Sequence, residues 1–224
     1  MTNPGILLDL GLREYGEALE LQRRLVDLRA RKIIPDTLIL VEHPHVFTVG
    51  KGIQGDVPEQ VMSVPVVRIE RGGQWTYHGP GQLVGYPILD LNARNREVRG
   101  FVQRIEETLI RALNQFAIPG ELHESQIGVW VKTKKIASIG AAIRNWVSFH
   151  GFALNVNTDL SYFQMITPCG FPGSTMTSME AQLRRQVDFV SVKNEVQRRF
   201  EQVFELELTT STPEVLEGSV TQAM

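Results

Sequence analysis

The sequence carries at positions 71–82 the glycine-rich stretch Arg71-Gly72-Gly73-Gln74-Trp75-Thr76-Tyr77-His78-Gly79-Pro80-Gly81-Gln82. Glycine permits positive φ and lets a backbone approach a ligand closely. The stretch lacks the Gly-Lys-Ser/Thr ending and the GxGxxG spacing of phosphate loops, and the residues after it have the pattern of a strand. Two interpretations stay open. The stretch forms either a narrow groove for an extended apolar ligand, walled by Trp75 and Tyr77, or a hairpin with aromatic packing across strands.

Outward from this stretch, groups of strands are separated by helices. Strand-like runs lie at 37–41, 46–50, 64–69, 82–91, 127–131, 136–143 and 147–156. Apolar residues have helical spacing at 15–31, 98–116 and 191–204. Because the helices do not alternate with single strands, the sequence predicts an α+β domain with a mixed or antiparallel sheet flanked by helices. We assign residues 1–208 to this domain and expect residues 209–224, rich in Ser, Thr and Glu, to be a poorly ordered tail.

Composition narrows the classes of function. The hydrophobic fraction of 42% and the charged fraction of 21% are typical of a soluble globular protein. A net charge of −2 gives no reason to expect a nucleic-acid partner. The sequence has no run of about 18 apolar residues and no signal-peptide pattern, so we expect no membrane partner and a cytoplasmic location. We also expect no metal, because CxxC units and histidine pairs at helical spacing are absent and His43 and His45 only flank Pro44.

Cys169 is the only cysteine, and it lies in Ile166-Thr167-Pro168-Cys169-Gly170. The flanking proline and glycine indicate a turn. A thiol on a turn becomes a thiolate at neutral pH when a cation or base lies nearby, which would make it a nucleophile. A lone cysteine can equally be a small buried apolar residue, so both interpretations stay open.

Three other titratable residues are candidates for a site. Lys135 directly precedes the apolar segment 136–140, and a lysine drawn into an apolar site can act as base and acid or stabilise a neighbouring thiolate. Its alternative is a solvated turn shared with Lys132 and Lys134. We expect His78 to line a site and His150, within a predicted strand, to be a hydrogen-bonded core residue.

Taken together, these segments resemble the lipoyl(octanoyl) transferases of lipoate biosynthesis. Five blocks occur in family order, at 42–50, 71–87, 135–140, 150–155 and 166–170. The resemblance implies a fold related to biotin and lipoate protein ligases and an enzyme without a cofactor. It also implies transfer of an octanoyl group from octanoyl-acyl carrier protein to a lysine of lipoyl domains, those of 2-oxoacid dehydrogenases and of the glycine cleavage H protein.

By the same resemblance, Cys169 is the acyl-accepting nucleophile and Lys135 activates it and handles the protons. The acyl pocket would be lined by Arg71, Gly72, Gly73, Gln74, Trp75, Thr76, Tyr77, His78, Ser138, Ile139, Gly140, Gly151, Phe152 and Ala153. The bulk of Phe152 bears on acyl chain length. Three alternatives stay open: an ATP-dependent lipoate or biotin ligase that needs no cysteine, an acyl thioesterase, and a non-catalytic module that binds acyl groups or carrier protein.

Overall fold

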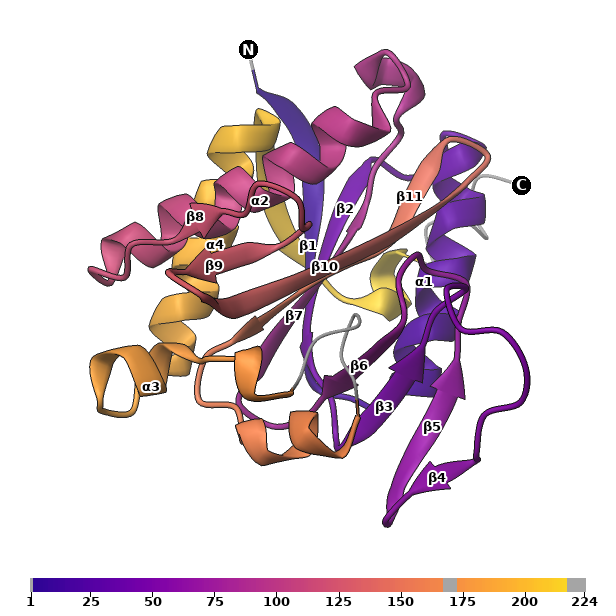
Figure 1. The fold of residues 1–224 in the computed structure, drawn as a ribbon. Coiled ribbons are helices and arrows are strands. Elements are labelled where there is room, and N and C mark those ends of the chain that lie inside the picture. The colour runs from indigo at the N-terminus through magenta and orange to yellow at the C-terminus, as the bar shows by residue number, and fades with distance from the viewer. Residues whose placement is uncertain (1, 167–172, 217–224) are drawn as a thin grey trace.

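The computed structural model describes residues 2–166 and 173–216. In this part of the chain an eight-stranded sheet has the order β12-β1-β2-β7-β11-β10-β9-β8 (Figure 1). Its strands are Asn3–Leu12 (β1), Asp36–Glu42 (β2), Gln82–Ile88 (β7), Glu121–Leu122 (β8), Val129–Val131 (β9), Lys134–Arg144 (β10), Val147–Asn155 (β11) and Leu206–Ser211 (β12). Strand β1 is parallel to β2 and β12, and the other pairs are antiparallel. The predicted mixed sheet is confirmed.

A smaller sheet incorporates the glycine-rich stretch. Its order is β4-β5-β3-β6, and its strands are Gln60–Val61 (β4), Val64–Arg68 (β5), Val46–Val49 (β3) and Trp75–His78 (β6). Tyr77 lies opposite Phe47, and their ring centroids are 5.8 Å apart. The stretch therefore forms a strand with aromatic cross-strand packing, as one of the two interpretations predicts.

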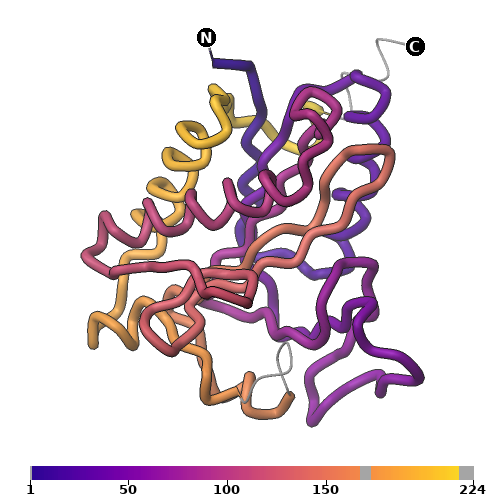
Figure 2. The backbone as a smooth tube through the Cα atoms, turned by 45° about the horizontal axis from the view of Figure 1, so that its top comes forward, coloured from indigo at the N-terminus to yellow at the C-terminus, as the bar shows by residue number. Residues whose placement is uncertain are grey.

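The helices cover both faces of the main sheet, as Figure 2 shows. They are Tyr15–Ala30 (α1), Val98–Gln115 (α2), Met179–Leu183 (α3) and Phe189–Phe204 (α4), with short 3-10 turns at Asn92–Arg94, Leu160–Met165 and Gly173–Thr175. Helix α1 packs on one face, and α2 and α4 pack on the other. The Asp188 carboxylate caps α4 by accepting a hydrogen bond from the Ser191 N–H (3.1 Å).

On each long helix, apolar residues spaced four apart lie on one side, and that side is buried against the sheet. In α2 these include Phe101, Ile105 and Leu109, and in α4 they include Val196 and Phe200. Full burial of each such side chain stabilises the fold by about 1.5–3 kcal/mol relative to exposure. The same spacing predicted three helices from the sequence, and all three are present within two residues of the expected bounds.

The parallel pairing of β1 with β2 and with β12, at one edge of the main sheet, was not expected from the sequence. Residues 209–211 continue strand β12, so the prediction of a poorly ordered tail is wrong for them. Leu206 and Leu208 are buried while Glu207 and Thr209 are exposed, so β12 packs only one face. A short one-sided strand has few apolar residues, which weakens its sequence signal. Residues 217–224 lie outside the described residues.

Candidate active site

A narrow cavity of about 30 Å³ lies between the main sheet and β6. Its lining consists of Tyr15, Arg71, Thr76, His78, Val84, Tyr86, Ser138, Ile139, Gly140, His150, Gly151, Phe152 and Ala153. Most of the residues that the sequence assigned to an acyl pocket thus meet at one place, from segments far apart in the chain. Tyr15, Val84, Tyr86 and His150 were not in that set. Alternation along β7 predicts that Val84 and Tyr86 share a face, but the sequence does not say what the face meets.

Strand alternation divides the glycine-rich stretch into two faces. Thr76 and His78 line the cavity. Trp75 and Tyr77 point the other way, where they pack in the core of the smaller sheet and the Tyr77 ring stacks on Tyr162 at 4.8 Å. The expectation that these two aromatic residues form a cavity wall is therefore not met, because successive side chains of a strand face opposite sides.

Gly72, Gly73 and Gln74 also lie outside the cavity lining. The Gly73 carbonyl accepts a hydrogen bond from the Gly52 N–H (2.9 Å), and the Gln74 carbonyl accepts one from the Gly50 N–H (3.1 Å). A Cβ at Gly50 would lie 2.6 Å from the Gly73 oxygen, so the two backbones approach too closely for side chains. This segment supports the cavity from outside by fixing the position of Arg71.

Arg71 closes one side of the cavity with a buried guanidinium. The guanidinium donates to the carbonyl and hydroxyl oxygens of Thr48 (3.1 and 3.0 Å) and to the Gly72 carbonyl (2.9 Å). Its stem lies against Gly140, where an added Cβ would be 3.0 Å from Arg71 Cδ. The absence of a side chain at Gly140 therefore makes room for the arginine.

A buried amide network sets the protonation of His78. Gln82 Nε2 donates to the Tyr77 carbonyl (3.2 Å) and to Asn155 Oδ1 (2.9 Å), so Gln82 Oε1 is the atom that accepts from His78 Nδ1 (2.8 Å). Burial holds the pKa of His78 well below its usual range, and nearby His43 adds to this effect. The ring is thus neutral with its proton on Nδ1, and Nε2 can only accept a hydrogen bond.

The Phe152 side chain lies on the face of the sheet opposite to the cavity. The ring packs in the core beneath α2, where a Cβ at Gly85 would be 2.1 Å from Phe152 Cζ. Its strand neighbour Ala153 belongs to the core on the α1 face. Phe152 therefore lines the cavity mainly through its backbone, and the expectation that its bulk shapes the cavity is not met.

Lys135 is buried at the start of β10, with 4% of its surface exposed. Its Nζ donates to the Ile127 carbonyl (2.8 Å) and lies 5.6 Å from the centre of the Trp130 ring. The Lys135 carbonyl accepts from the Thr177 N–H (2.9 Å), so the chain that follows residue 172 returns beside the lysine. The alternative of a solvated turn is excluded for Lys135. Cys169 lies outside the described residues.

Gly128 and Glu106, which the sequence analysis did not single out, position the lysine. A Cβ at Gly128, where φ is +125°, would lie 2.6 Å from Lys135 Cε. The Gly128 N–H donates to Glu106 Oε1 (3.0 Å), which ties this loop to α2. Gly128 is thus required by close approach to the lysine. A sequence shows only a glycine after a predicted loop here, so this role could not be inferred from it.

The other histidines are engaged in hydrogen bonds or buried. His43 Nδ1 donates to the Arg13 carbonyl (2.7 Å) and its Nε2 accepts from the Tyr86 hydroxyl (2.8 Å). Burial lowers the pKa of His43 to about 4, so this arrangement of protons is the stable one. His150 is 1% exposed and lines the cavity, but its ring makes no hydrogen bond, which differs from the expected hydrogen-bonded core residue.

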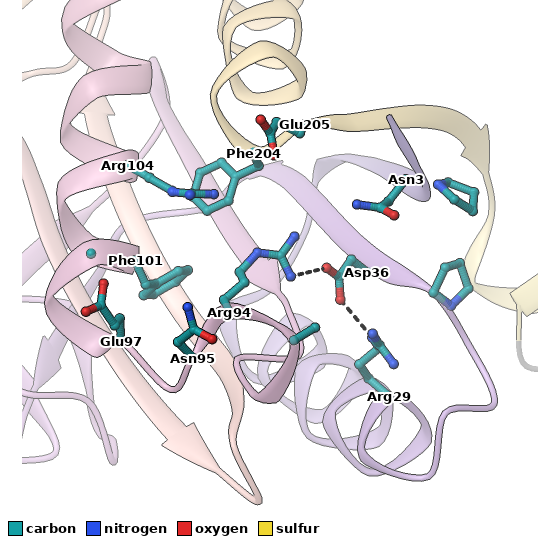
Figure 3. Close-up of a pocket in the computed structure, with 14 residues that line it drawn as sticks. Asn3, Arg29, Asp36, Arg94, Asn95, Glu97, Phe101, Arg104, Phe204 and Glu205 are labelled. Carbon is teal, nitrogen blue, oxygen red and sulfur yellow. Dashed lines mark hydrogen bonds and ion pairs between the residues drawn. The ribbon is translucent and has the colours of Figure 1, made fainter. Parts of the chain in front are cut away.

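A second, larger hollow of about 500 Å³ lies near the start of β2 and contains none of the predicted site residues (Figure 3). At its centre Asp36 accepts from Arg29 (2.7 Å) and from Arg94 (2.7 Å). The Asp90 N–H also donates to Asp36 (2.9 Å). Because these groups satisfy one another, this cluster joins α1, β2 and the turn before α2.

Among the described residues no helix is long and apolar enough to cross a membrane.

Comparison with known proteins agrees with this geometry. Residues 14–201 match the family model described as the lipoyl protein ligase A/B catalytic domain. The octanoyltransferase of Syntrophotalea carbinolica is 46% identical over 86% of this chain and 91% of its own length. The octanoyltransferase of Syntrophobacter fumaroxidans is 40% identical over 96% of this chain and 97% of its own.

Solved structures share the fold at much lower identity. A lipoate-protein ligase A bound with ATP aligns with a TM-score of 0.72 at 16% identity, covering 99% of this chain and 94% of that one. The bipartite lipoate protein ligase of Thermoplasma acidophilum aligns with a TM-score of 0.72 at 18% identity, covering 98% of this chain and 92% of that one. The biotin protein ligase of Aquifex aeolicus aligns with a TM-score of 0.52 at 13% identity, covering 99% of this chain and 74% of that one. The expected relation to the fold of lipoate and biotin ligases is confirmed. By its family model and its similar relatives, the chain belongs to the lipoyl protein ligase A/B catalytic domain family.

Proposed function

We propose that this protein is an octanoyltransferase, which moves an octanoyl group from octanoyl-acyl carrier protein to a lysine of a lipoyl domain. The observation that carries the proposal is the cavity along β10, the strand that holds the buried Lys135 near its start and lines the cavity with Ser138, Ile139 and Gly140. Relatives at 40–46% identity that are named octanoyltransferase support it. The acceptors would be the lipoyl domains of 2-oxoacid dehydrogenases and the glycine cleavage H protein, in the cytoplasm.

The cavity suits a flexible apolar chain. It is narrow, and Gly140 and Gly151, which pair across β10 and β11, place no side chain on its floor. A Cβ at Gly151 would be 2.3 Å from the Gly85 oxygen, so the strands approach closely there. Each buried CH₂ contributes about 0.8 kcal/mol, so an octanoyl chain gains substantial binding energy without charged contacts.

The reaction then proceeds in two acyl transfers. Lys135 takes the proton of the Cys169 thiol, and the thiolate attacks the carbonyl carbon of the octanoyl thioester. The bond to the carrier sulfur breaks, and the carrier leaves as a thiol with the proton that Lys135 returns. An acceptor lysine amine next attacks the enzyme thioester. The new C–N bond forms, the C–S bond breaks, and the amine proton goes through Lys135 to Cys169.

Intact-mass spectrometry of the purified protein tests the proposal. Incubation with octanoyl-acyl carrier protein in the absence of ATP should add one octanoyl group, and peptide mapping should locate it at Cys169. The Cys169→Ala variant should take up none. An unmodified protein that instead transfers free octanoate only when ATP is supplied, with or without Cys169, would contradict the proposal and favour a ligase.

A further inference from the structure

His150 lines the cavity, is 1% exposed, and has two buried ring nitrogens without a hydrogen-bond partner. The amide nitrogen of its neighbour Gln22, which is 0% exposed, also lacks a partner, although Gln22 does not line the cavity. The Glu70 carboxylate lies close by, with its Oε2 3.9 Å from His150 Nε2. Buried polar groups are almost always hydrogen-bonded in native proteins, so a histidine in this state on a cavity wall indicates a role.

The backbone at His150 explains why its ring faces α1. The pairing of β11 with β7 ends at Phe152, and the Pro87 carbonyl accepts from the Ser148 hydroxyl (2.7 Å). The His150 N–H donates instead to Gln22 Oε1 of α1 (2.8 Å), and its φ is +53°. Because of this kink, consecutive rings of Phe149 and His150 stack at 4.7 Å on the same side of the sheet.

The strand register locates His150 at the end of the cavity farthest from Lys135. Gly140 pairs with Gly151, and Ala141 pairs with His150. A rise of about 3.3 Å per residue puts Gly140 roughly 17 Å along β10 from Lys135. The seven carbon–carbon bonds of an octanoyl group, each about 1.5 Å, extend over roughly 9 Å. An acyl chain that enters at the Lys135 end and extends along β10 would point its terminal methyl group toward Gly140 and His150.

We propose that His150 is the specificity-determining residue for acyl chain length, because its imidazole forms a polar stop at the distal end of the cavity. The inference rests on the proposed function, since it names the length of acyl group that the same cavity accepts. When the chain ends short of the ring, the ring nitrogens keep access to a hydrogen-bonding water. A longer chain packs methylene groups against the ring nitrogens and leaves them unpaired, which disfavours it.

The test compares variants of His150 in competition between carrier proteins loaded with hexanoyl, octanoyl, decanoyl and dodecanoyl groups. His150→Leu removes the polar atoms, and we expect the decanoyl-to-octanoyl ratio of kcat/KM for acylation to rise roughly tenfold or more. His150→Asn keeps a hydrogen-bonding group and should retain the octanoyl preference. Phe149→Leu is the matched control, because Phe149 is buried next to His150 but does not line the cavity.

The outcomes separate this inference from the proposed function. If His150→Leu takes up octanoyl groups and keeps the wild-type ratio, the inference is overturned while the proposed function stands. An equal rise of the ratio in Phe149→Leu would also overturn it, since general loosening of β11 would then explain the effect. If the wild-type protein accepts no acyl group of any length, the proposed function itself fails. Should His150→Leu not fold, the ratio for the larger His150→Phe, expected to shift toward hexanoyl, decides instead.

Discussion

Replacement of Gly128 by alanine tests whether the position of Lys135 matters for acyl transfer. The new Cβ would lie 2.6 Å from the Ala137 carbonyl oxygen, 2.6 Å from Lys135 Cε and 3.2 Å from Lys135 Nζ. The Ala137 oxygen belongs to β10 and cannot move easily, and the Gly128 N–H is held by Glu106. The lysine side chain is therefore the group that shifts.

Two effects of this substitution can be sized. A side chain at a φ of +125° is strained, which lowers the free energy of unfolding by about 1–3 kcal/mol. A displacement of the reacting group by about 1 Å reduces rates by roughly 10²-fold. We therefore expect Gly128→Ala to remain folded at 25 °C and to acquire an octanoyl group from its carrier roughly 10²-fold more slowly than the wild type.

The matched control is Gly55→Ala, because Gly55 also has positive φ (+81°) but an added Cβ meets nothing within 4 Å. This variant should lose stability through strain alone and be acylated near the wild-type rate. Rapid-quench mass spectrometry gives the acylation rate, and urea unfolding gives the stability. Wild-type acylation by a folded Gly128→Ala protein would refute the claim that Lys135 must stay in this position.

Three further predictions concern buried polar groups. Asp36→Ala removes the buried carboxylate that Arg29 and Arg94 share and leaves them only Asp90 as a partner among the described residues. It should lower the free energy of urea unfolding by about 3–5 kcal/mol. Asp27→Ala, which breaks an exposed pair, should lower it by less than about 1 kcal/mol; equal losses would contradict this. Gln82→Leu removes the hydrogen-bond partner of His78, Tyr77 and Asn155. It should lower the free energy of urea unfolding by about 1–3 kcal/mol for each group left unpaired, and a loss below about 1 kcal/mol would show that the network relaxes. Burial lowers the pKa values of His43 and His150 from 6.5 to about 4, so the unfolded chain binds more protons than the folded protein between these pH values. The free energy of unfolding should be full above pH 6.5 and fall toward pH 4, by up to about 3 kcal/mol per histidine. A flat pH profile would argue against neutral buried rings.

The sequence predicted well those elements whose patterns are local. The helices at α1, α2 and α4 follow from apolar residues spaced three and four apart, because a helix buries one side. Strand β1 was missed, although its run Ile6-Leu7-Leu8-Asp9-Leu10 is apolar, since the sequence does not show that β2 and β12 pair with it. Partners that lie far apart in the chain are decided by tertiary packing.

The candidate site, too, could be predicted from the sequence only in part. The glycine-rich stretch is visible in the sequence, but which of its residues line the cavity depends on the pairing of β6 with β3. That pairing turns Thr76 and His78 toward the cavity and Tyr77 away from it. The effects at Gly128 and His150 arise from close approaches and a backbone kink at single positions, for which the sequence carries no periodic signal.

The central claim is that the protein transfers an octanoyl group through a covalent intermediate, and a single-turnover transfer experiment tests it most directly. The protein is labelled with radioactive octanoyl groups from carrier protein, freed from the donor, and mixed with a lipoyl domain without ATP. We predict that the label moves from Cys169 to one lysine of the domain in step with its loss from the enzyme. Label that stays on the enzyme, or leaves as free octanoate with the domain unmodified, would contradict the account.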